Sequence, residues 1–374
     1  MTEDHSELEE IRRSAQRVIS DQAERRTLME MSEKGVAARR DLWNAMAELG
    51  WLGFTIPEAD GGVGQSFAAA AVLYEELGKV LSPLPLLQVL IGVEVIARMS
   101  DPQMRSSLMS RASAGDLVFT LLPPGASPLT ARNMPDGIEV SGAAAGLMSD
   151  ERSTHLLFGV TFNGERRYAM LPLSGAQGRI IPCPTWDQSR KLCDISFASV
   201  AIRAEHFLSK DVNSALEAHF DLALACDSIG GAEAIFTDTI NYMSMRQQFG
   251  RAIASFQALK HRCADHKVML EAARVLVEDA VFRFSSVADA SSTVAAATAK
   301  LYATTVYRQI AEDAIQLHGG IGFTWAHDCH LFLKRALLNE VLGGSPEAYR
   351  DRIAAPLIRR ARLKTDQART QHQL

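Results

Sequence analysis

The segment 246–261, RQQFGRAIASFQALKH, combines residue types that suit a long anionic ligand. Arg246 carries a planar cation whose fork of N–H donors matches the oxygens of a phosphate. Phe249 and Gly250 would let a flat apolar ring approach the backbone, because one is aromatic and the other has no Cβ. Gln257 adds a neutral amide near the start of the next predicted helix. These residues predict a ligand-binding site.

A second group of such residues lies in AIQLHGGIGF, residues 314–323. Gln316 offers an amide, and the pair Gly319–Gly320 offers backbone N–H groups that no side chain covers, a feature of anion sites. A plainer interpretation of both segments stays open. In that interpretation Arg246 pairs with a local carboxylate, and the two glycines only form a turn between helices.

The tetrapeptide HDCH, residues 327–330, places two histidines three positions apart with a cysteine between them. Zinc sites use these ligands, but they need a third and a fourth, and no CxxC or HExxH motif accompanies them here. The sequence therefore predicts no metal site. GxSxG is also absent, so no serine nucleophile is indicated.

The hydrophobic pattern divides the chain into three parts. Helical periodicity dominates the first part, short β-prone runs separated by Gly, Pro, Asn and Asp fill the middle, and long helical stretches follow. We expect an α+β fold, mostly α: an N-terminal helical domain (1–115), a small β-barrel or sandwich domain (116–208) and a C-terminal four-helix bundle (209–374). The expected bundle helices are 211–245, 256–284, 293–317 and 327–342. The basic tail from Ile358 is expected to be exposed or frayed.

Composition narrows the class of protein. The chain has 374 residues, 47% of them hydrophobic, and a net charge of -5, which argues against nucleic acid as the main partner. The acidic N-terminus has no apolar signal region, and no apolar run is long enough for a membrane span. Five scattered cysteines, an odd number, favour free thiols. We expect a soluble cytoplasmic protein.

Four segments in order resemble the acyl-CoA dehydrogenases, flavoenzymes that oxidise the α,β bond of a CoA thioester: ELGWLGFTIPEADGGVG (48–64), VLYEELGKVLSP (72–83), RQQFGRAIASFQALKHRCAD (246–265) and AIQLHGGIGFTWAHDCHLFLKRA (314–336). The resemblance implies FAD as cofactor, an acyl-CoA substrate and an electron-transfer flavoprotein as electron acceptor. It also implies which residues reach across a dimer interface to the adenine-dinucleotide half of a neighbour's FAD: Arg246, Phe249, Gln257, Gln316, Gly319 and Gly320.

The chain departs from the family where the catalytic base should stand. The usual base position falls on Gly343, within LGGS (342–345), and glycine carries no proton acceptor. Other members place the base on the preceding bundle helix, where the position is Phe220. Asp221 is the adjacent carboxylate, but one residue is about 100° of helical rotation. We expect Asp221 to face elsewhere, as a solvated or first-turn carboxylate, and keep it as a weak candidate base.

The loops that hold the flavin ring are altered as well. LPPGASPL (122–129) and GAAAGLMSD (142–150) stand where the family has "TEPxAGSD" and "GxKxWITN". The chain thus resembles the base-lacking partner subunit of bacterial heterotetrameric acyl-CoA dehydrogenases of the steroid side-chain type. That resemblance implies a homologous catalytic subunit as partner and two flavins per four chains. Two alternatives stay open: a homomeric dehydrogenase with a relocated base, and a pseudoenzyme that binds acyl-CoA or a protein partner.

Overall fold

The computed structural model describes residues 2–22, 25, 33–99, 101–125, 127–135, 137–210, 212–286, 290–325 and 327–371. Helices come first: α1 (Thr2–Gln22), α3 (Glu33–Glu48), α4 (Phe67–Lys79), α5 (Leu86–Ile96) and α6 (Pro102–Ser113). The helices α4 and α5 are buried along nearly their whole length, because apolar residues occupy every face of them. Helix α6 begins where the Asp101 carboxylate accepts the N–H groups of Gln103 and Met104.

Strands follow in the middle of the chain: β1 (Val118–Leu121), β2 (Thr130–Met134), β3 (Gly137–Ser149), β4 (Ser153–Phe162), β5 (Glu165–Pro172), β6 (Arg179–Cys183) and β7 (Lys191–Ile202). They form one sheet in the order β1-β4-β2-β3-β7-β6, with β5 on β4. Strand β1 also pairs with β3, where Leu121 lies opposite Met148, so the strands close on themselves. The sheet encloses a core of its own that includes Phe158, Ile195 and Phe197.

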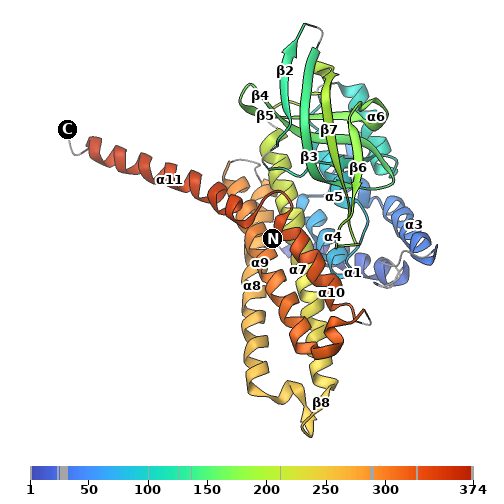
Figure 1. Cartoon of the computed structure of the whole chain (residues 1–374), viewed down its shortest axis with the longest axis vertical. Helices are drawn as coiled ribbons and strands as arrows, with labels where there is room; N and C mark the ends of the chain where they lie inside the picture. Colours follow the sequence, from blue (N-terminus) through green and yellow to red (C-terminus); the bar gives the residue numbers. More distant parts are fainter. Residues whose placement is uncertain are drawn as a thin grey trace.

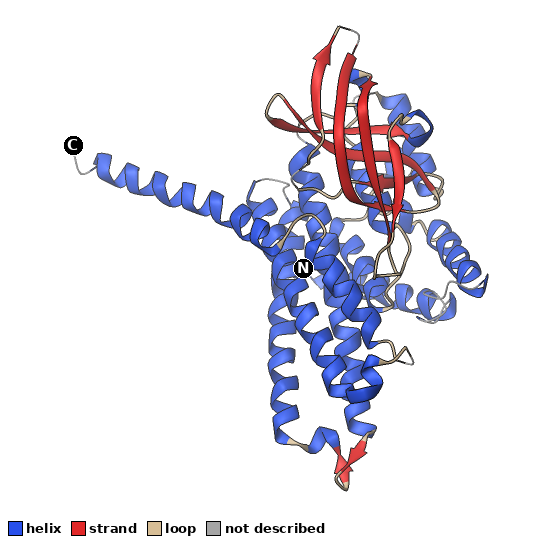
Figure 2. Ribbon diagram, viewed as in Figure 1, coloured by secondary structure: helices blue, strands red, loops and turns tan. Residues whose placement is uncertain are grey.

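Long helices form the rest: α7 (Val212–Met245), α8 (Gln257–Ser286), α9 (Ala290–His318), α10 (Cys329–Val341) and α11 (Pro346–Gln371). The first four make a bundle, in which α9 packs against each of the other three. Figure 1 shows the sheet at one end of the bundle and the small hairpin of β8 (Gln247–Gln248) and β9 (Arg251–Ala252) at the opposite end. In Figure 2 the helices surround the base of the sheet, and α11 projects away from the body.

The predicted fold class is confirmed, and each bundle helix begins and ends within a few residues of its expected bounds. The tail from Ile358 differs from the expectation, because α11 continues through it to Gln371. Ile358 itself is exposed, as expected. None of the helices that the structure describes combines the length and the apolar character needed to cross a bilayer.

A buried ion pair joins the parts of the molecule. Arg335 on α10 is only 2% exposed and donates from Nε and Nη2 to the Asp227 carboxylate of α7, at 3.1 and 3.0 Å. The same guanidinium donates to the Ser82 carbonyl after α4 (2.9 Å) and to Ser189 Oγ in the loop between β6 and β7 (2.5 Å). Asn339 donates a further bond to Asp227, at 2.7 Å. Because every donor has a partner, the charges can stay buried.

Removing one member of this pair should strongly destabilise the fold. We expect Asp227→Ala to lower the free energy of unfolding by about 3–5 kcal/mol, because it leaves the Arg335 cation buried without its carboxylate. Urea unfolding followed by circular dichroism measures the change. Glu347→Ala is the control, since its ion pair with Arg350 is exposed and should change the free energy of unfolding very little. A loss under about 1 kcal/mol in Asp227→Ala would contradict the structural role of the pair.

The same pair should make stability depend on pH. Burial alone would raise the pKa of Asp227, but Arg335 and Arg190 outweigh it and hold the pKa below its usual 3.8. A carboxylate with a depressed pKa stabilises the fold above its unfolded pKa, and this contribution is lost as the pH falls through the folded value. The stability difference between the native chain and Asp227→Asn should therefore be constant above about pH 5 and shrink below about pH 4. A difference that grows on acidification would contradict the assignment.

Candidate functional site

The hairpin at the tip of the bundle presents Phe249 to the outside. Its two-residue turn consists of Phe249 and Gly250, with φ of 53° and 77°, the mirror-image turn that suits the twist of a tight hairpin. The Phe249 side chain is 91% exposed, and its ring lies nearly at a right angle to the Phe256 ring, with 6.1 Å between centroids. The left-handed backbone disfavours a large side chain, and the exposed Phe249 ring buries little surface against its own chain. A contact with another molecule is the plainest reason for an aromatic residue at this position.

Arg246 ends α7 with its backbone satisfied and its side chain free to reach outward. Its N–H donates to the Tyr242 carbonyl and its own carbonyl accepts from the Ile253 N–H, both at 2.8 Å. The side chain is exposed, and no carboxylate in the described part of the chain pairs with it. Local ion pairing, the plainer interpretation of Arg246, is therefore not what the structure shows.

The two predicted segments meet at the same end of the bundle. Tyr242 Oη donates to the His318 carbonyl at 3.3 Å, which ties the end of α7 to the end of α9. Beneath this contact a small apolar cluster joins the same helices and the start of α8, with Met243, Cys263 and Leu317 at its centre. Gln257, at the start of α8, and Gln316, in the last turn of α9, are both exposed there.

The glycine pair opens the 3-10 turn η6 (Gly319–Phe323), which continues from α9. Gly319 needs its residue type, because its φ is 62°. Gly320 does not have a left-handed φ, and a Cβ built on it would meet no atom within 4 Å. Nothing in the described chain therefore requires glycine at 320. The open space beside this backbone is what an incoming anion needs.

A separate cavity of about 650 Å³ lies around Gly343, between the sheet and the bundle. Most of its lining is apolar, and Arg166, Glu217 and Arg352 contribute the charged groups. The lining segments are the altered loops of the β domain and the turn between α10 and α11: Leu122, Pro123, Pro124, Gly125, Ala145, Gly146, Val341, Leu342, Gly343, Gly344 and Ser345. By the resemblance, the matching segments of related enzymes hold the flavin ring and the catalytic base.

The backbone at Gly343 is closed in by its neighbours. Its φ is 82°, and a Cβ there would lie 2.7 Å from Tyr349 Oη, 3.0 Å from the Phe220 ring and 3.1 Å from the Pro124 carbonyl. Its own carbonyl oxygen would be 2.5 Å from a Cβ on Gly125, so the two loops touch backbone to backbone. A side chain of any kind is therefore excluded at the usual base position, unless the loops move apart.

The two residues considered as alternative base positions are both fully buried on α7. Phe220 packs its ring against Gly343. Asp221 accepts a hydrogen bond from Tyr349 Oη at 2.5 Å and forms an ion pair with Arg352. The expectation that Asp221 is solvated or sits in a first turn is wrong, because two residues of α11 reach back over α7 and bury it. Both carboxylate oxygens of Asp221 therefore have partners within the chain.

The two altered loops of the β domain, 122–129 and 142–150, are the ring-side loops. Polar groups of these loops bond within the chain. Leu147 and Met148 are buried in core clusters and do not line the cavity, and Leu122, which does line it, has no hydroxyl to offer a flavin ring. The Leu122 N–H donates to the Leu157 carbonyl at 2.9 Å, and the Gly146 N–H donates to Asp194 Oδ1 at 3.0 Å. Two backbone donors of these loops are therefore already occupied.

Comparison with known proteins decides the family. Residues 4–116 match the model of the acyl-CoA dehydrogenase N-terminal domain, and residues 218–358 match that of the C-terminal domain. Acyl-CoA dehydrogenase IpdE2 of Mycolicibacterium smegmatis is 33% identical over 85% of this chain and 88% of its own length. IpdE2 of Mycobacterium tuberculosis is 34% identical over 79% of this chain and 80% of its length. The chain belongs to the acyl-CoA dehydrogenase family.

Solved structures agree with the family. A variant of the Tcur3481-Tcur3483 steroid ACAD superposes with a TM-score of 0.86 at 26% identity, over 96% of this chain and 99% of that one. The ChsE4-ChsE5 complex from Mycobacterium tuberculosis matches with a TM-score of 0.85 at 20% identity, over 94% and 97%, which shows a shared fold.

Three residues at or near the cavity were not found from the sequence: Tyr349 and Arg352, which line it, and Lys300, which packs against Tyr349. Lys300 is fully buried, donates to the Glu340 carbonyl at 3.0 Å and lies 3.9 Å from the Tyr349 ring centroid. Burial lowers the pKa of Lys300 to about 8. The only signal for this group was its spacing, since Tyr349 and Arg352 share a helix face at i,i+3.

Restoring the family's glutamate at position 343 should destabilise the fold, so that the new carboxylate could not serve as a base. We expect Gly343→Ala to lower the free energy of unfolding by more than about 2 kcal/mol, through its left-handed φ and the contacts with Tyr349 and Pro124, and Gly343→Glu by more still. Gly164→Ala is the matched control, because Gly164 has a φ of 79° with open space around it, so it reports backbone strain alone. Equal losses in Gly343→Ala and Gly164→Ala would contradict the packing argument.

Proposed function

We propose that this chain is the non-catalytic partner subunit of a heteromeric, FAD-dependent acyl-CoA dehydrogenase. One observation carries the proposal. The groups suited to a dinucleotide face outward without partners in the described chain, whereas the position of the catalytic base is closed by packing. We call the first set the clasp: Arg246, Phe249, Gln257, Gln316, Gly319 and Gly320.

The residues fit one half of FAD and not the other. Arg246 can pair with pyrophosphate oxygens, Gly319 and Gly320 can offer backbone N–H groups, and Phe249 can cover a flat ring. The ring-side loops do not fit a flavin ring, because Leu122, Leu147 and Met148 carry no hydroxyl and the N–H groups of Leu122 and Gly146 are in use. When bound, FAD supplies the hydride acceptor for α,β-oxidation of the thioester. In our proposal this chain only holds and orients the dinucleotide of an FAD whose ring lies on the catalytic subunit.

The substrate class follows from the relatives. The Tcur3481-Tcur3483 steroid ACAD is named for steroids, and we extend that class to the acyl group oxidised by this complex. The partners are then a homologous catalytic subunit, a steroid side-chain CoA thioester and an electron-transfer flavoprotein. Cytoplasmic location follows from the same proposal, since these partners are intracellular.

Asp221 gives little support to a homomeric enzyme with a relocated base. To abstract a proton it would have to leave both Arg352 and Tyr349, and it does not line the cavity. The flavin content of the isolated chain separates the remaining readings. A colourless chain that gains about one flavin per two subunits on co-expression with its catalytic partner supports the proposal. Stoichiometric FAD and turnover in the chain alone would overturn it, and a stable complex without flavin would favour a pseudoenzyme.

Two substitutions in the clasp should weaken flavin retention by the complex. Arg246→Ala should raise the dissociation constant for FAD at least about tenfold, because a charge-assisted pair with phosphate is lost. Gly320→Leu should do the same by filling the space that is open beside η6, while leaving the unfolding free energy of the isolated chain within about 0.5 kcal/mol of the native value. Flavin fluorescence during dilution of the purified complex measures retention.

The control for these variants is Arg283→Ala, an exposed arginine of α8 that pairs with Asp279 one turn away. It should leave flavin retention unchanged. If Arg246→Ala and Gly320→Leu retain flavin as well as Arg283→Ala does, the clasp assignment is incorrect, even if the complex itself forms.

A further inference from the structure

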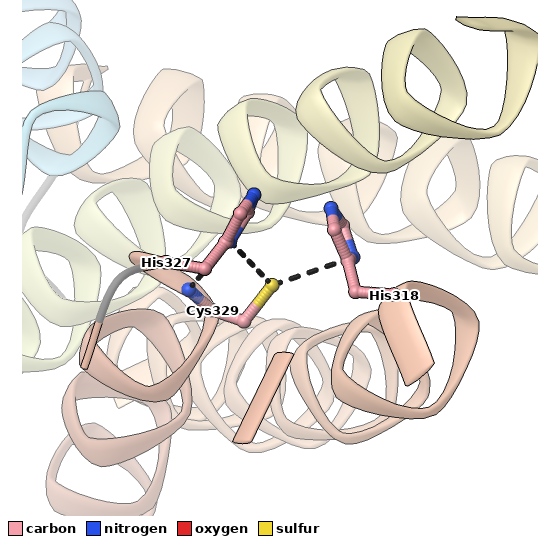
Figure 3. Close-up of side chains that lie close together, drawn as sticks. All are labelled: His318, His327 and Cys329. Atoms are coloured by element: carbon pink, nitrogen blue, oxygen red, sulfur yellow. Dashed lines mark hydrogen bonds between the residues drawn. The ribbon is translucent and has the colours of Figure 1, made fainter. Parts of the chain in front are cut away.

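Three residues with metal-binding side chains converge where α9 gives way to α10. His318 is the last residue of α9, and His327 and Cys329 stand at the start of α10. Figure 3 shows both imidazole rings directed at one sulfur. Cys329 Sγ lies 3.1 Å from His327 Nδ1 and 3.4 Å from His318 Nδ1. The HDCH motif contains His327, Cys329 and His330, and from it the sequence predicted no metal site. The third side chain here is His318, which lies outside the motif.

The spacing of these atoms is close to that of a coordinated cation. With Zn–S of about 2.3 Å and Zn–N of about 2.0–2.1 Å, a tetrahedral site has S···N edges of about 3.6 Å. The observed 3.1 and 3.4 Å need to open by only a few tenths of an ångström to accept the ion. Two imidazoles and one thiolate form a donor set that favours zinc or copper(I) over hard cations.

The group is buried within the bundle. His318 is 3% exposed, and Cys329 is fully buried. The Nδ1 atom of His318 contacts the Ala314 carbonyl at 2.7 Å, so in the ion-free chain Nδ1 carries the proton that a bound metal would displace. The Nε2 atom on the other side of the ring has no hydrogen-bond partner in the described chain, so its lone pair can take that proton.

The surrounding charges suit a bound cation. Cys329 is fully buried, and its Sγ–H can donate to His327 Nδ1. Asp238 and Asp328 both act on this thiol, and Arg25 pairs with both carboxylates, at 3.0 and 3.7 Å. One guanidinium against two carboxylates leaves one negative charge. A divalent ion on one thiolate and two neutral imidazoles has one positive charge left, so the two offset each other.

We propose that His318, His327 and Cys329 bind one zinc-like cation, with the fourth position open to water. On binding, Cys329 Sγ loses its proton to solvent and forms the metal–sulfur bond, and His327 Nδ1 turns its lone pair from the thiol proton to the ion. His318 Nδ1 gives up its proton and its bond to Ala314, and the proton moves to Nε2. The ion then fastens the end of α9 to the start of α10 and fixes the turn that carries Gly319 and Gly320.

Cobalt(II) tests the site, because it replaces zinc and is coloured. The full chain, alone and in complex with its catalytic partner, should bind one equivalent with a near-ultraviolet thiolate-to-cobalt band and strong visible bands of a four-coordinate ion, both removed by zinc. Cys329→Ser should abolish the thiolate band. His318→Gln and His327→Gln should weaken binding at least about tenfold, as a lost ligand costs no less than a lost outer-shell partner.

Two controls separate this cluster from its neighbours. His330→Gln changes the other histidine of the HDCH motif, whose ring meets the Trp325 ring edge to face, and Cys263→Ser changes another buried cysteine of the bundle, which contacts Met243. Both should bind cobalt as the native chain does. His327 is only half-buried, so its variant keeps the test valid if Cys329→Ser does not fold. Absence of the thiolate band in the native chain, or its survival in folded Cys329→Ser, would overturn the proposal. Metal binding can be tested whether or not the clasp holds flavin.

Discussion

The buried pair of Arg335 and Asp227 is the constraint on which the rest of the architecture depends. One guanidinium contacts α7, the loop after α4 and the loop between β6 and β7, so it holds the bundle, the N-terminal helices and the sheet at fixed distances from one another. Separating the two side chains would be costly in free energy, because each donor would then be buried without a partner. The cavity around Gly343 lies between two of these parts, the sheet and the bundle.

Polar groups at the two ends of the bundle differ in whether they have partners inside the chain. Near the sheet, Asp221, Lys300 and the donors of the ring-side loops all find partners inside the chain. At the hairpin end, Arg246 and Gly320 are left open. A satisfied group cannot serve a ligand without first losing its partner, whereas an open group can bind at no such cost. This difference is the physical basis for assigning ligand binding to one end.

The sequence predicted what depends on neighbouring residues. The bundle helices follow from hydrophobic periodicity, and the residues proposed for the clasp were chosen from short local motifs around Arg246 and Gly319. It could not predict the crowding around Gly343, because Pro124, Phe220 and Gly343 come from three distant segments and meet only in the fold. His318 escaped detection for a related reason. Its distance from HDCH along the chain matches no short ligand motif, and only the turn of η6 brings it to Cys329.

The absence of a base at Gly343 is more informative than a single substitution would be. A lone Glu-to-Gly change would leave a void, and the void could be filled again by reversion. Here Phe220, Tyr349 and the Pro124 carbonyl crowd the place that a Cβ on Gly343 would take, and Arg352 pairs with Asp221. Several elements would have to move together to regain a base, since each contact supports the others. The packing therefore fits a chain whose contribution to oxidation lies at the clasp, with the chemistry carried by another subunit.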